Sequence, residues 1–303
     1  MEAGTRAVRS TGLRALLADY LEMTKPKVQS LLLFTTVTTM YVAGHPSLGL
    51  VALTCLGGAL SAGGAGAINH ALDRDLDAVM KRTARRPVAS GRVSPRAAIV
   101  YGVLLGCASF ALLALTVNAL AAVLAMSGLL GYVLVYTLWL KRSTPQNIVI
   151  GGAAGAVPPL VGWAAVTGEL GGASLYLFAI IFYWTPPHFW ALSLLMKDEY
   201  AKAGVPMMPV VRGEAETRRQ ILLYSILLVA VSVLPFAGRL FDGAYLVSAL
   251  VLGGALCTMA LVLYRRAAER PADGRRWALR VYLYSLAYLA LLFGAMVVDK
   301  RLV

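Results

Sequence analysis

Long apolar runs without charge recur along the whole chain and constrain its fold more than any other feature. A run of about twenty apolar residues is long enough to cross a bilayer as one helix. We therefore predict an all-α integral membrane protein, with a single transmembrane domain from residue 28 to residue 303. Its nine predicted spans cover residues 28–44, 48–69, 96–115, 119–138, 147–166, 172–196, 220–238, 243–264 and 277–298.

The composition agrees with a membrane protein and excludes a nucleic-acid partner. Only 14 % of the 303 residues are charged, whereas 59 % are hydrophobic, and soluble domains carry about a quarter charged residues. The net charge of +13 reflects the Lys and Arg that cytoplasmic loops of membrane proteins collect. Cys55, Cys107 and Cys257 all lie inside apolar runs, so they form neither a disulfide framework nor a metal site.

The distribution of basic residues predicts the orientation of the chain. If the N-terminus is cytoplasmic, one side of the membrane holds 25 of the 28 Lys and Arg residues, and only Arg239, Lys300 and Arg301 lie on the other. This bias predicts a cytoplasmic N-terminus and a C-terminus outside. The cytoplasmic segments are then 1–27, 70–95, 139–146, 197–219 and 265–276, with Arg96 and Arg280 at adjoining span ends.

The N-terminal segment, residues 1–27, is predicted to be cytoplasmic and to contain a helix that lies on the membrane surface. Leu13, Leu16, Leu17, Tyr20 and Leu21 share one face of such a helix. Residues 1–10 fit a frayed basic tail. Since the start shows neither a cleavable signal peptide nor a long presequence, a bacterial plasma membrane is the simpler location, with a mitochondrial inner membrane as the alternative.

Proline pairs interrupt two predicted spans at matching depth. Pro158–Pro159 and Pro186–Pro187 each remove two backbone donors and force a kink. Each pair lies eleven residues from a cytoplasmic landmark, Asn147 or Asp198, which is about 16 Å along a helix. Irregular backbone at that depth is tolerated where it lines a cavity. The two breaks therefore predict a pocket that opens from the cytoplasmic side.

An acidic motif follows the second span, within "NHALDRDLDAVMKRTARRP" from Asn69 to Pro87. If the helix continues, Asn69, Asp73 and Asp77 share one face, since each is four residues from the next. Two carboxylates about 6 Å apart repel unless a cation lies between them, and such oxygen ligands suit Mg²⁺. The alternative is a solvated loop whose acids pair with its arginines. A solvated loop accounts for Arg74 and Asp75, but it does not explain well why Asn69, Asp73 and Asp77 share one face.

Basic residues near the acidic motif are candidate diphosphate ligands, because guanidinium and ammonium groups bind phosphate oxygens. Four of them lie at the cytoplasmic ends of the first and fourth spans, namely Lys25, Lys27, Lys141 and Arg142. For these four, the ordinary excess of positive charge in cytoplasmic loops is an equally good explanation. The candidates are Lys25, Lys27, Lys81, Arg82, Arg85, Arg86, Lys141 and Arg142.

A second constellation, "KDEYAKAGVPMMP", follows the sixth span at Lys197–Pro209. Asp198 and Lys202 are four residues apart on one helical face. They either form an intrahelical ion pair or bind a further Mg²⁺ and a phosphate.

Together these motifs resemble the UbiA-type intramembrane prenyltransferases, whose first aspartate-rich motif is Asn-x3-Asp-x3-Asp. The fuller motif, with "RT" and "RP", resembles the branch of that family that farnesylates haem. So do "TKPKV" at 24–28, "YTLWLKRSTPQNIVIGGAAGAVPPLVGW" at 136–163 and "WTPPHFWALSLLMKDEYAKAGVPMMPV" at 184–210. These blocks cover the first six spans.

The resemblance implies nine helices around a central cavity, with Mg²⁺ held at its cytoplasmic end by Asn69, Asp73, Asp77 and Asp198. The implied reaction transfers a farnesyl group from farnesyl diphosphate to a vinyl group of haem b. A haem A synthase or an oxidase assembly factor is a possible downstream partner. Where the family often has a second Asp-x3-Asp motif, this chain has Met196 and Tyr200, which leaves the ligands of a second Mg²⁺ open.

His188 lies well inside the sixth span and directly follows a proline pair. It is either a ligand or contact of haem iron, in a pocket with Trp184 and Trp190, or a polar residue that satisfies carbonyls freed by the kink. His70 lies about 100° away from the aspartate face, and we assign it no role.

Two other functions compete with haem farnesylation. One is prenylation of an aromatic acceptor in quinone biosynthesis, against which the "PPHFW" block argues. The other is secondary transport, since transporters also place broken helices at mid-membrane. A transporter does not need an aspartate face beside a basic cluster, and coupled ion transport favours a mid-span acid, which the sequence lacks.

Overall fold

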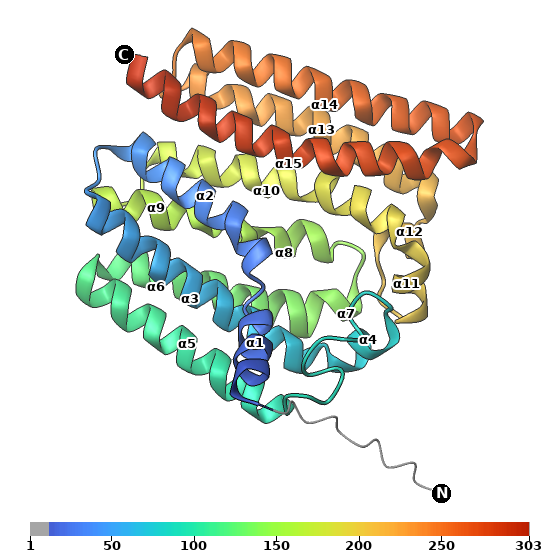
Figure 1. Cartoon of the computed structure of the whole chain (residues 1–303). Helices are drawn as coiled ribbons and strands as arrows, with labels where there is room; N and C mark the ends of the chain where they lie inside the picture. The colour runs from blue at the N-terminus through green and yellow to red at the C-terminus, as the bar shows by residue number, and fades with distance from the viewer. Residues whose placement is uncertain (1–11, 303) are drawn as a thin grey trace, which may run out of the picture.

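The computed structural model describes residues 12–302, except for the side chains at 268, 271, 301 and 302. Within that range all regular secondary structure is helical. The longer helices form the body of the molecule (Figure 1). They are α2 (Pro26–Ala43), α3 (Leu48–Leu72), α5 (Pro95–Thr116), α6 (Ala119–Leu130), α8 (Asn147–Gly155), α9 (Val157–Thr167), α10 (Gly172–Leu195), α13 (Gly213–Ala237), α14 (Gly243–Glu269) and α15 (Pro271–Leu302).

Shorter elements connect the long helices. They are α1 (Leu13–Met23), α4 (Arg74–Val79), a π-helix η1 (Gly131–Leu140), α7 (Lys141–Ser143), α11 (Lys197–Lys202) and α12 (Met208–Val211). Figure 1 shows α4, α7, α11 and α12 near one end of the molecule, together with the turn between α14 and α15. The C-terminus lies at the opposite end. The charged connections predicted to share one side of the membrane therefore do lie at one end of the bundle.

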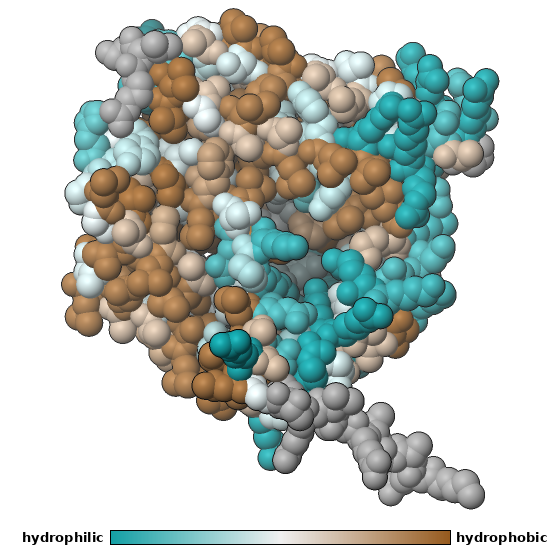
Figure 2. Space-filling model, in the orientation of Figure 1, coloured by the Kyte–Doolittle hydropathy of each residue, from teal (hydrophilic) through white to brown (hydrophobic). Residues whose placement is uncertain are grey.

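The long helices pack as a closed ring. Helix α2 packs on α3 and α9, α3 on α5, α5 on α6, and α6 on α9. Helices α8 and α9 pack on α10, which joins α13 and α15, with α14 packed between those two. Contact of α15 with α2 closes the ring. Figure 2 shows a hollow in one face of the molecule, bordered by hydrophilic residues.

Seven helical segments in the described residues are long and apolar enough to span a membrane, rather than nine. They are Leu48–Leu72, Pro95–Thr116, Ala119–Ser143, Asn147–Thr167, Gly213–Ala237, Gly243–Ala267 and Ala272–Lys300. The other two predicted spans correspond to α2 and α10, which carry more polar residues. Four threonines of α2, at positions 35, 36, 38 and 39, are buried inside the molecule, and α10 contains two tryptophans, two prolines and a histidine.

The two proline pairs have different effects on the backbone. Helix α8 ends at Gly155 and α9 begins at Val157, so the break predicted at Pro158–Pro159 is confirmed, centred on Ala156 just before the proline pair. The second predicted break is wrong, since α10 runs as one helix through Pro186–Pro187. The missing amide hydrogens at these prolines leave two carbonyls of the preceding turn without their helical donors, yet the helix continues.

The turn between α1 and α2 packs tightly on α3. A Cβ at Gly66 would lie 2.7 Å from the carbonyl oxygen of Met23, so only glycine permits this approach. On the other side of α1, Leu13, Leu17 and Leu21 are exposed, with 60–71 % of their surface accessible. The helix predicted within residues 13–21 is thus present. Its leucines are exposed, whereas Tyr20 of the predicted apolar face packs edge-to-face on Tyr101. The predicted frayed tail, residues 1–10, lies outside the described residues.

Candidate active site

Asn69, in the last turn of α3, joins three segments of the chain. Its side-chain oxygen accepts a hydrogen bond of 2.6 Å from the ammonium of Lys25. Its amide nitrogen donates to Asp73 Oδ2 at 2.6 Å and to Thr137 Oγ1 at 3.2 Å. The side chain is buried. Asn69 therefore links the α1–α2 turn, the acidic motif and the π-helix η1.

Asp73 lies at the junction of α3 and α4. The shared face was inferred on the condition that the helix continues past Ile68; α3 does continue, as far as Leu72, and ends at Asp73, whose φ is −94° and ψ is 8°. Helical spacing nevertheless persists across the junction. The Asp73 amide donates to the Asn69 carbonyl, and the Asp77 amide donates to the Asp73 carbonyl. The acidic motif therefore keeps its four-residue repeat.

Each buried carboxylate of the motif is paired with a cation. Lys141 Nζ forms a short hydrogen bond and ion pair with Asp73 Oδ2. Arg86 Nη1 contacts both carboxylate oxygens of Asp77, at 2.9 and 2.8 Å. Asp73 Oδ1 is buried and has no hydrogen-bond partner among the described residues. One carboxylate oxygen is therefore available for a ligand.

Asp75 and Arg142 form a separate pair that holds the junction of α3 and α4. Two guanidinium nitrogens contact the Asp75 oxygens at 2.8 and 2.7 Å, and Arg142 also donates to the Leu72 carbonyl at 2.9 Å. The hydrogen bond from Arg142 is the main cause that lowers the pKa of Asp75 to about 2. The predicted alternative, in which acids pair with arginines, thus describes Asp75. Arg74 is exposed and forms no ion pair in the described residues.

Lys25 brings a third cation into the motif through an unusual backbone conformation. Its φ of 55° lies in the left-handed region, which is rare for residues with a side chain and is found mainly at functional sites. The pKa of the Lys25 ammonium is lowered to about 7. Burial is the main cause, and the charges of Arg86 and Lys141 act in the same direction, whereas Asp73 and Asp77 act in the opposite direction. Three cations thus face two carboxylates, which leaves a net positive site suited to an anion.

The π-helix places the polar residues that lie opposite the acidic motif. It directly precedes Lys141 and contains Tyr132, Tyr136 and Thr137, and π-helical turns are frequent at functional sites. The Lys25 ammonium lies 5.8 Å from the centre of the Tyr132 ring, and the Tyr132 and Tyr136 rings are 5.4 Å apart. A Cβ at Gly151 would lie 2.4 Å from Tyr136, so only glycine accommodates this ring. These aromatic residues were not identified from the sequence.

Six of these residues lie together: Lys25, Asn69, Asp73, Asp77, Arg86 and Lys141. We call them the diphosphate cluster, after the ligand proposed for them below. Its donor set fits a hard divalent cation, because such ions prefer oxygen ligands and Asp73 Oδ1 accepts no hydrogen bond from the described residues, with Arg142 Nη2 3.8 Å away. No group of three or more His, Cys, Asp or Glu residues in the described chain forms a metal site by itself. A metal here would therefore depend on the Asn69 oxygen as well as on two carboxylates.

Several predicted ligands are not drawn into the diphosphate cluster. They are exposed and have no side-chain hydrogen bond or ion pair with any described residue. These are Lys27, Lys81, Arg82, Arg85, Asp198 and Lys202. The intrahelical ion pair offered as the alternative for Asp198 and Lys202 is likewise absent from this part of the structure.

In α11 the side chain that turns inward is Tyr200 rather than an acid. Tyr200 is buried, and this burial raises the pKa of its phenol, although the nearby charges of Arg82, Lys141 and Arg86 lower it. Glu199 Oε2 is buried without a hydrogen-bond partner among the described residues. The second constellation therefore lies near the cations of the diphosphate cluster, but presents a phenol there.

His188 lies between two aromatic rings in the interface of α10 and α15. It stacks on Trp184 at 4.3 Å and on Tyr282 at 4.8 Å between ring centres. Its Nδ1 is 2.7 Å from Ser285 Oγ, while Trp184 donates its indole hydrogen to the Ser285 carbonyl. The side chain that His188 hydrogen-bonds thus belongs to α15, whereas the prediction based on the kink expected carbonyls of α10.

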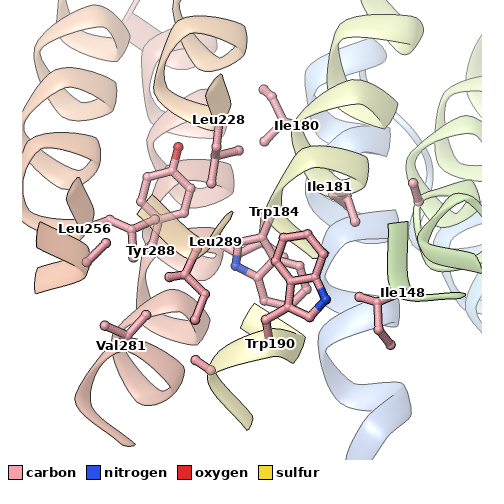
Figure 3. Packing of buried hydrophobic residues seen from close by; sticks show 14 of the residues in the cluster. Ile148, Ile180, Ile181, Trp184, Trp190, Leu228, Leu256, Val281, Tyr288 and Leu289 are labelled. Carbon is pink, nitrogen blue, oxygen red and sulfur yellow. The ribbon is translucent and has the colours of Figure 1, made fainter. Parts of the chain in front are cut away.

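Trp190 and Asn147 carry buried polar groups without partners, and the sequence used Asn147 only as a depth marker. Both atoms of the Asn147 amide and the Trp190 indole nitrogen lack hydrogen bonds in the described structure. A Cβ at Gly152 would lie 3.0 Å from Thr185, so the antiparallel helices α8 and α10 bring Asn147 to the level of Trp190. In Figure 3 the Trp190 nitrogen points toward Ile148, the neighbour of Asn147. Unpaired buried polar groups are costly, so this level of the bundle is suited to a polar ligand or an internal water.

The family assignment rests on the sequence. Residues 31–286 match the model of the UbiA prenyltransferase family. The chain belongs to this family. A protein of Chloroflexus aurantiacus named protoheme IX farnesyltransferase is 54 % identical over 99 % of this chain and 50 % of its own length. One of the same name from Symbiobacterium thermophilum is 53 % identical over 93 % of both chains. The chain spans about half the length of several of these curated relatives.

Solved structures of family members share the fold. A digeranylgeranylglyceryl phosphate synthase superposes with a TM-score of 0.76 at 17 % identity, over 95 % of this chain and 99 % of that one. A UbiA homologue from Archaeoglobus fulgidus, bound to DMAPP and Mg²⁺, gives a TM-score of 0.67 at 18 % identity, over 91 % of this chain and 99 % of that one. The predicted resemblance to UbiA-type prenyltransferases is therefore confirmed.

Proposed function

We propose that this chain transfers a farnesyl group from farnesyl diphosphate to a vinyl group of haem b. The observation that carries the proposal is the diphosphate cluster, in which three cations surround two buried carboxylates and an asparagine. The relatives named protoheme IX farnesyltransferase, at more than 50 % identity, support the choice of prenyl donor and acceptor.

The residues of the diphosphate cluster have two roles in the first step, in which the bond between the farnesyl carbon and the diphosphate oxygen breaks. Asn69, Asp73 and Asp77 would hold Mg²⁺, which supplies positive charge to the leaving diphosphate when bound. The homologue bound to DMAPP and Mg²⁺ supports this use of a metal. Lys25, Arg86 and Lys141 bind the diphosphate oxygens and stabilise the negative charge that grows as the carbon–oxygen bond breaks. Asp198 and Lys202, both exposed on α11, are further proposed contacts of the metal and the diphosphate.

Two half-buried tyrosines take part in the second step, in which the allylic cation reacts with the haem vinyl group. Tyr132 and Tyr136 present ring faces beside the diphosphate cluster, and such faces stabilise a nearby cation. The apolar walls of the bundle keep water from the allylic cation until the vinyl carbon attacks it. Water then adds to the resulting cation on the haem side chain and releases a proton, which leaves a hydroxyethylfarnesyl group.

The haem acceptor is proposed to lie near His188. With Nδ1 engaged by Ser285, Nε2 is the nitrogen of His188 that remains for haem iron. Trp184 and Tyr282 hold the imidazole ring in place from both sides. Trp190, two residues further along α10, is also buried and packs edge-to-face on Tyr224 of α13; it is the third residue proposed for the haem pocket.

The same proposal includes the arrangement in the membrane. The positive-inside distribution supports nine crossings by α2, α3, α5, α6 to α7, α8 to α9, α10, α13, α14 and α15. The diphosphate cluster then faces the cytoplasm of a bacterial cell, and the C-terminus lies outside. The exposed leucines of α1 support a helix that rests on the cytoplasmic surface of the bilayer.

One experiment tests the reaction as a whole. Purified protein is incubated with haem b, farnesyl diphosphate and Mg²⁺, and the haem is then analysed by mass spectrometry. We expect a haem that has gained one farnesyl group and one hydroxyl group. A parallel reaction with a hydroxybenzoate or naphthoate acceptor distinguishes quinone biosynthesis. Conversion of that acceptor, with haem b unchanged, would contradict the proposal.

A further inference from the structure

A cavity outside the diphosphate cluster lies among the charged ends of α10, α13, α14 and α15. Its volume is about 200 Å³. The lining combines two arginines and one glutamate with small and apolar residues. The lining residues are Leu194, Glu214, Arg218, Leu263, Gly274 and Arg275. We name it the two-arginine cavity.

Arg218 enters this cavity with unused hydrogen-bonding capacity. Its side chain is only 13 % exposed, and its Nε is buried without a partner among the described residues. The one acid that it contacts is Glu214, at 3.5 Å, and Glu214 is shared with Lys197, which is closer, at 3.0 Å. A guanidinium group binds a carboxylate through two parallel hydrogen bonds when it can. Arg218 forms no such bidentate contact here.

Arg275 faces the same cavity and ties α15 to α10. It donates a hydrogen bond of 3.2 Å to the Leu195 carbonyl, which uses one of its five donors. It is seven residues before Tyr282, and Leu195 is seven residues after His188. Seven residues are about two helical turns and return to nearly the same face, about 10 Å away.

The two-arginine cavity therefore lies along the same interface of α10 and α15 in which His188 stacks on Tyr282, two turns closer to the charged end of the bundle. We propose that this cavity binds the carboxylates of the prenyl acceptor, which for haem b are its two propionates. The inference rests on the proposed function, since it assigns one end of the acceptor named there.

The chemistry of haem b matches this arrangement. Its ring is apolar and carries vinyl groups, whereas both propionates extend from one edge. A charged carboxylate inside a membrane protein requires a cationic partner. Arg218 and Arg275 provide two guanidinium groups on the cytoplasmic side of His188. Glu214 is half-exposed and remains paired with Lys197, so it can yield Arg218 to an incoming carboxylate.

Haem b and its dimethyl ester provide the test, because esterification removes the propionate charges and preserves the ring. Binding to the intact protein in detergent is measured by Soret titration, without farnesyl diphosphate. We expect haem b to bind at least tenfold more tightly than the diester. Arg218→Gln and Arg275→Gln should remove most of that preference, while the affinity for farnesyl diphosphate stays unchanged.

Arg219→Gln is the matched control, since Arg219 is the neighbouring arginine on α13 and is 62 % exposed. It should retain the preference for haem b. Equal affinities of the wild-type protein for haem b and its diester would overturn this inference, even if farnesyl transfer is observed. A wild-type protein that binds haem b but prenylates only another acceptor would instead contradict the proposed function. The comparison of haem b with its dimethyl ester uses the wild-type protein, so it tests the inference even if an arginine variant fails to fold.

Discussion

The ammonium of Lys25 lies 2.6 Å from the side-chain oxygen of Asn69, which ties the turn before α2 to the end of α3. The contact requires the left-handed backbone of Lys25 and brings a third cation close to Arg86 and Lys141. Such an arrangement opposes folding unless an anion binds. The strain and the charge repulsion at Lys25 are therefore consistent with a site prepared for diphosphate.

The lowered pKa of Lys25 predicts how stability depends on pH. Below pH 7 the ammonium is charged in both the folded and the unfolded protein, so its burial is unfavourable. Between pH 7 and 10.5 the folded protein has lost this proton while the unfolded chain retains it, so the free energy of unfolding rises with pH. In metal-free protein, we expect the thermal midpoint of Lys25→Met to exceed that of wild type most below pH 7.

The advantage of Lys25→Met should shrink steadily as the pH rises to 9, which differential scanning fluorimetry in chelator can follow. Lys27→Met is the matched control, because Lys27 is exposed two residues away and should show no such pH-dependent difference. A constant gap between Lys25→Met and wild type from pH 6 to 9 would show that Lys25 stays charged in the folded protein.

Removal of a charge from the acidic motif should abolish catalysis without unfolding the protein. Asp73→Asn and Asp77→Asn each remove a carboxylate that we propose binds the metal, and we expect turnover to fall at least a hundredfold, as for other losses of charge stabilisation. Asp75→Asn is the control, since Asp75 is exposed and pairs only with Arg142; its turnover should fall far less. Full activity of wild type in excess chelator would contradict the metal assignment.

The sequence predicted the positions of the helices well because hydropathy reports burial in lipid directly. All nine predicted spans coincide with helical segments, although one end of each of the last three differs from that of α13, α14 or α15 by five to seven residues. The acidic motif retains its spacing. The sequence did not predict where local backbone hydrogen bonding ends a helix or lets it continue. Asp73 ends α3 at a single residue, whereas α10 passes through two prolines without a break. Neither outcome follows from the residue types alone.

Other features of the candidate site depend on contacts between distant segments. Thr137 reaches Asn69 only because a π-helix precedes Lys141, and no sequence rule identifies that helix. The role of Lys25 depends on a positive φ that is unusual for lysine. Asn147 was visible as a polar residue at a span end, but its lack of partners required the packing of α8 on α10.

Asn147→Leu should separate stability from function. Both polar atoms of its amide are buried without partners, and each such group costs about 1–3 kcal/mol. Leucine has the same branched skeleton as asparagine but slightly bulkier ends, so we expect the free energy of unfolding to rise by about this amount where the site tolerates the methyl groups. We expect turnover to fall, since an unpaired amide is kept for a ligand. A loss of stability would instead show that an internal water satisfies the amide.

Cysteine labelling tests the orientation in the membrane. In a background without Cys55, Cys107 and Cys257, the variants Val79→Cys and Ala215→Cys should resist an impermeant thiol reagent in intact cells. Glu169→Cys, at the opposite end of the bundle, should react. All three positions are exposed, and Ala215 avoids the positive φ of Gly213. The reverse pattern would place the diphosphate cluster outside the cell.

His188→Ala should weaken haem binding and shift the Soret band of bound haem, because the imidazole Nε2 is proposed to contact the iron. The affinity for farnesyl diphosphate should stay nearly unchanged, since His188 is ten residues, or about 15 Å, from Asp198 along the chain. Ser285→Ala is the companion variant. It removes the hydroxyl that orients the ring but keeps the imidazole, so it should give a smaller Soret shift. An unaltered Soret band with normal haem affinity in His188→Ala would exclude the ligand role, and His188 would then only pack α10 against α15.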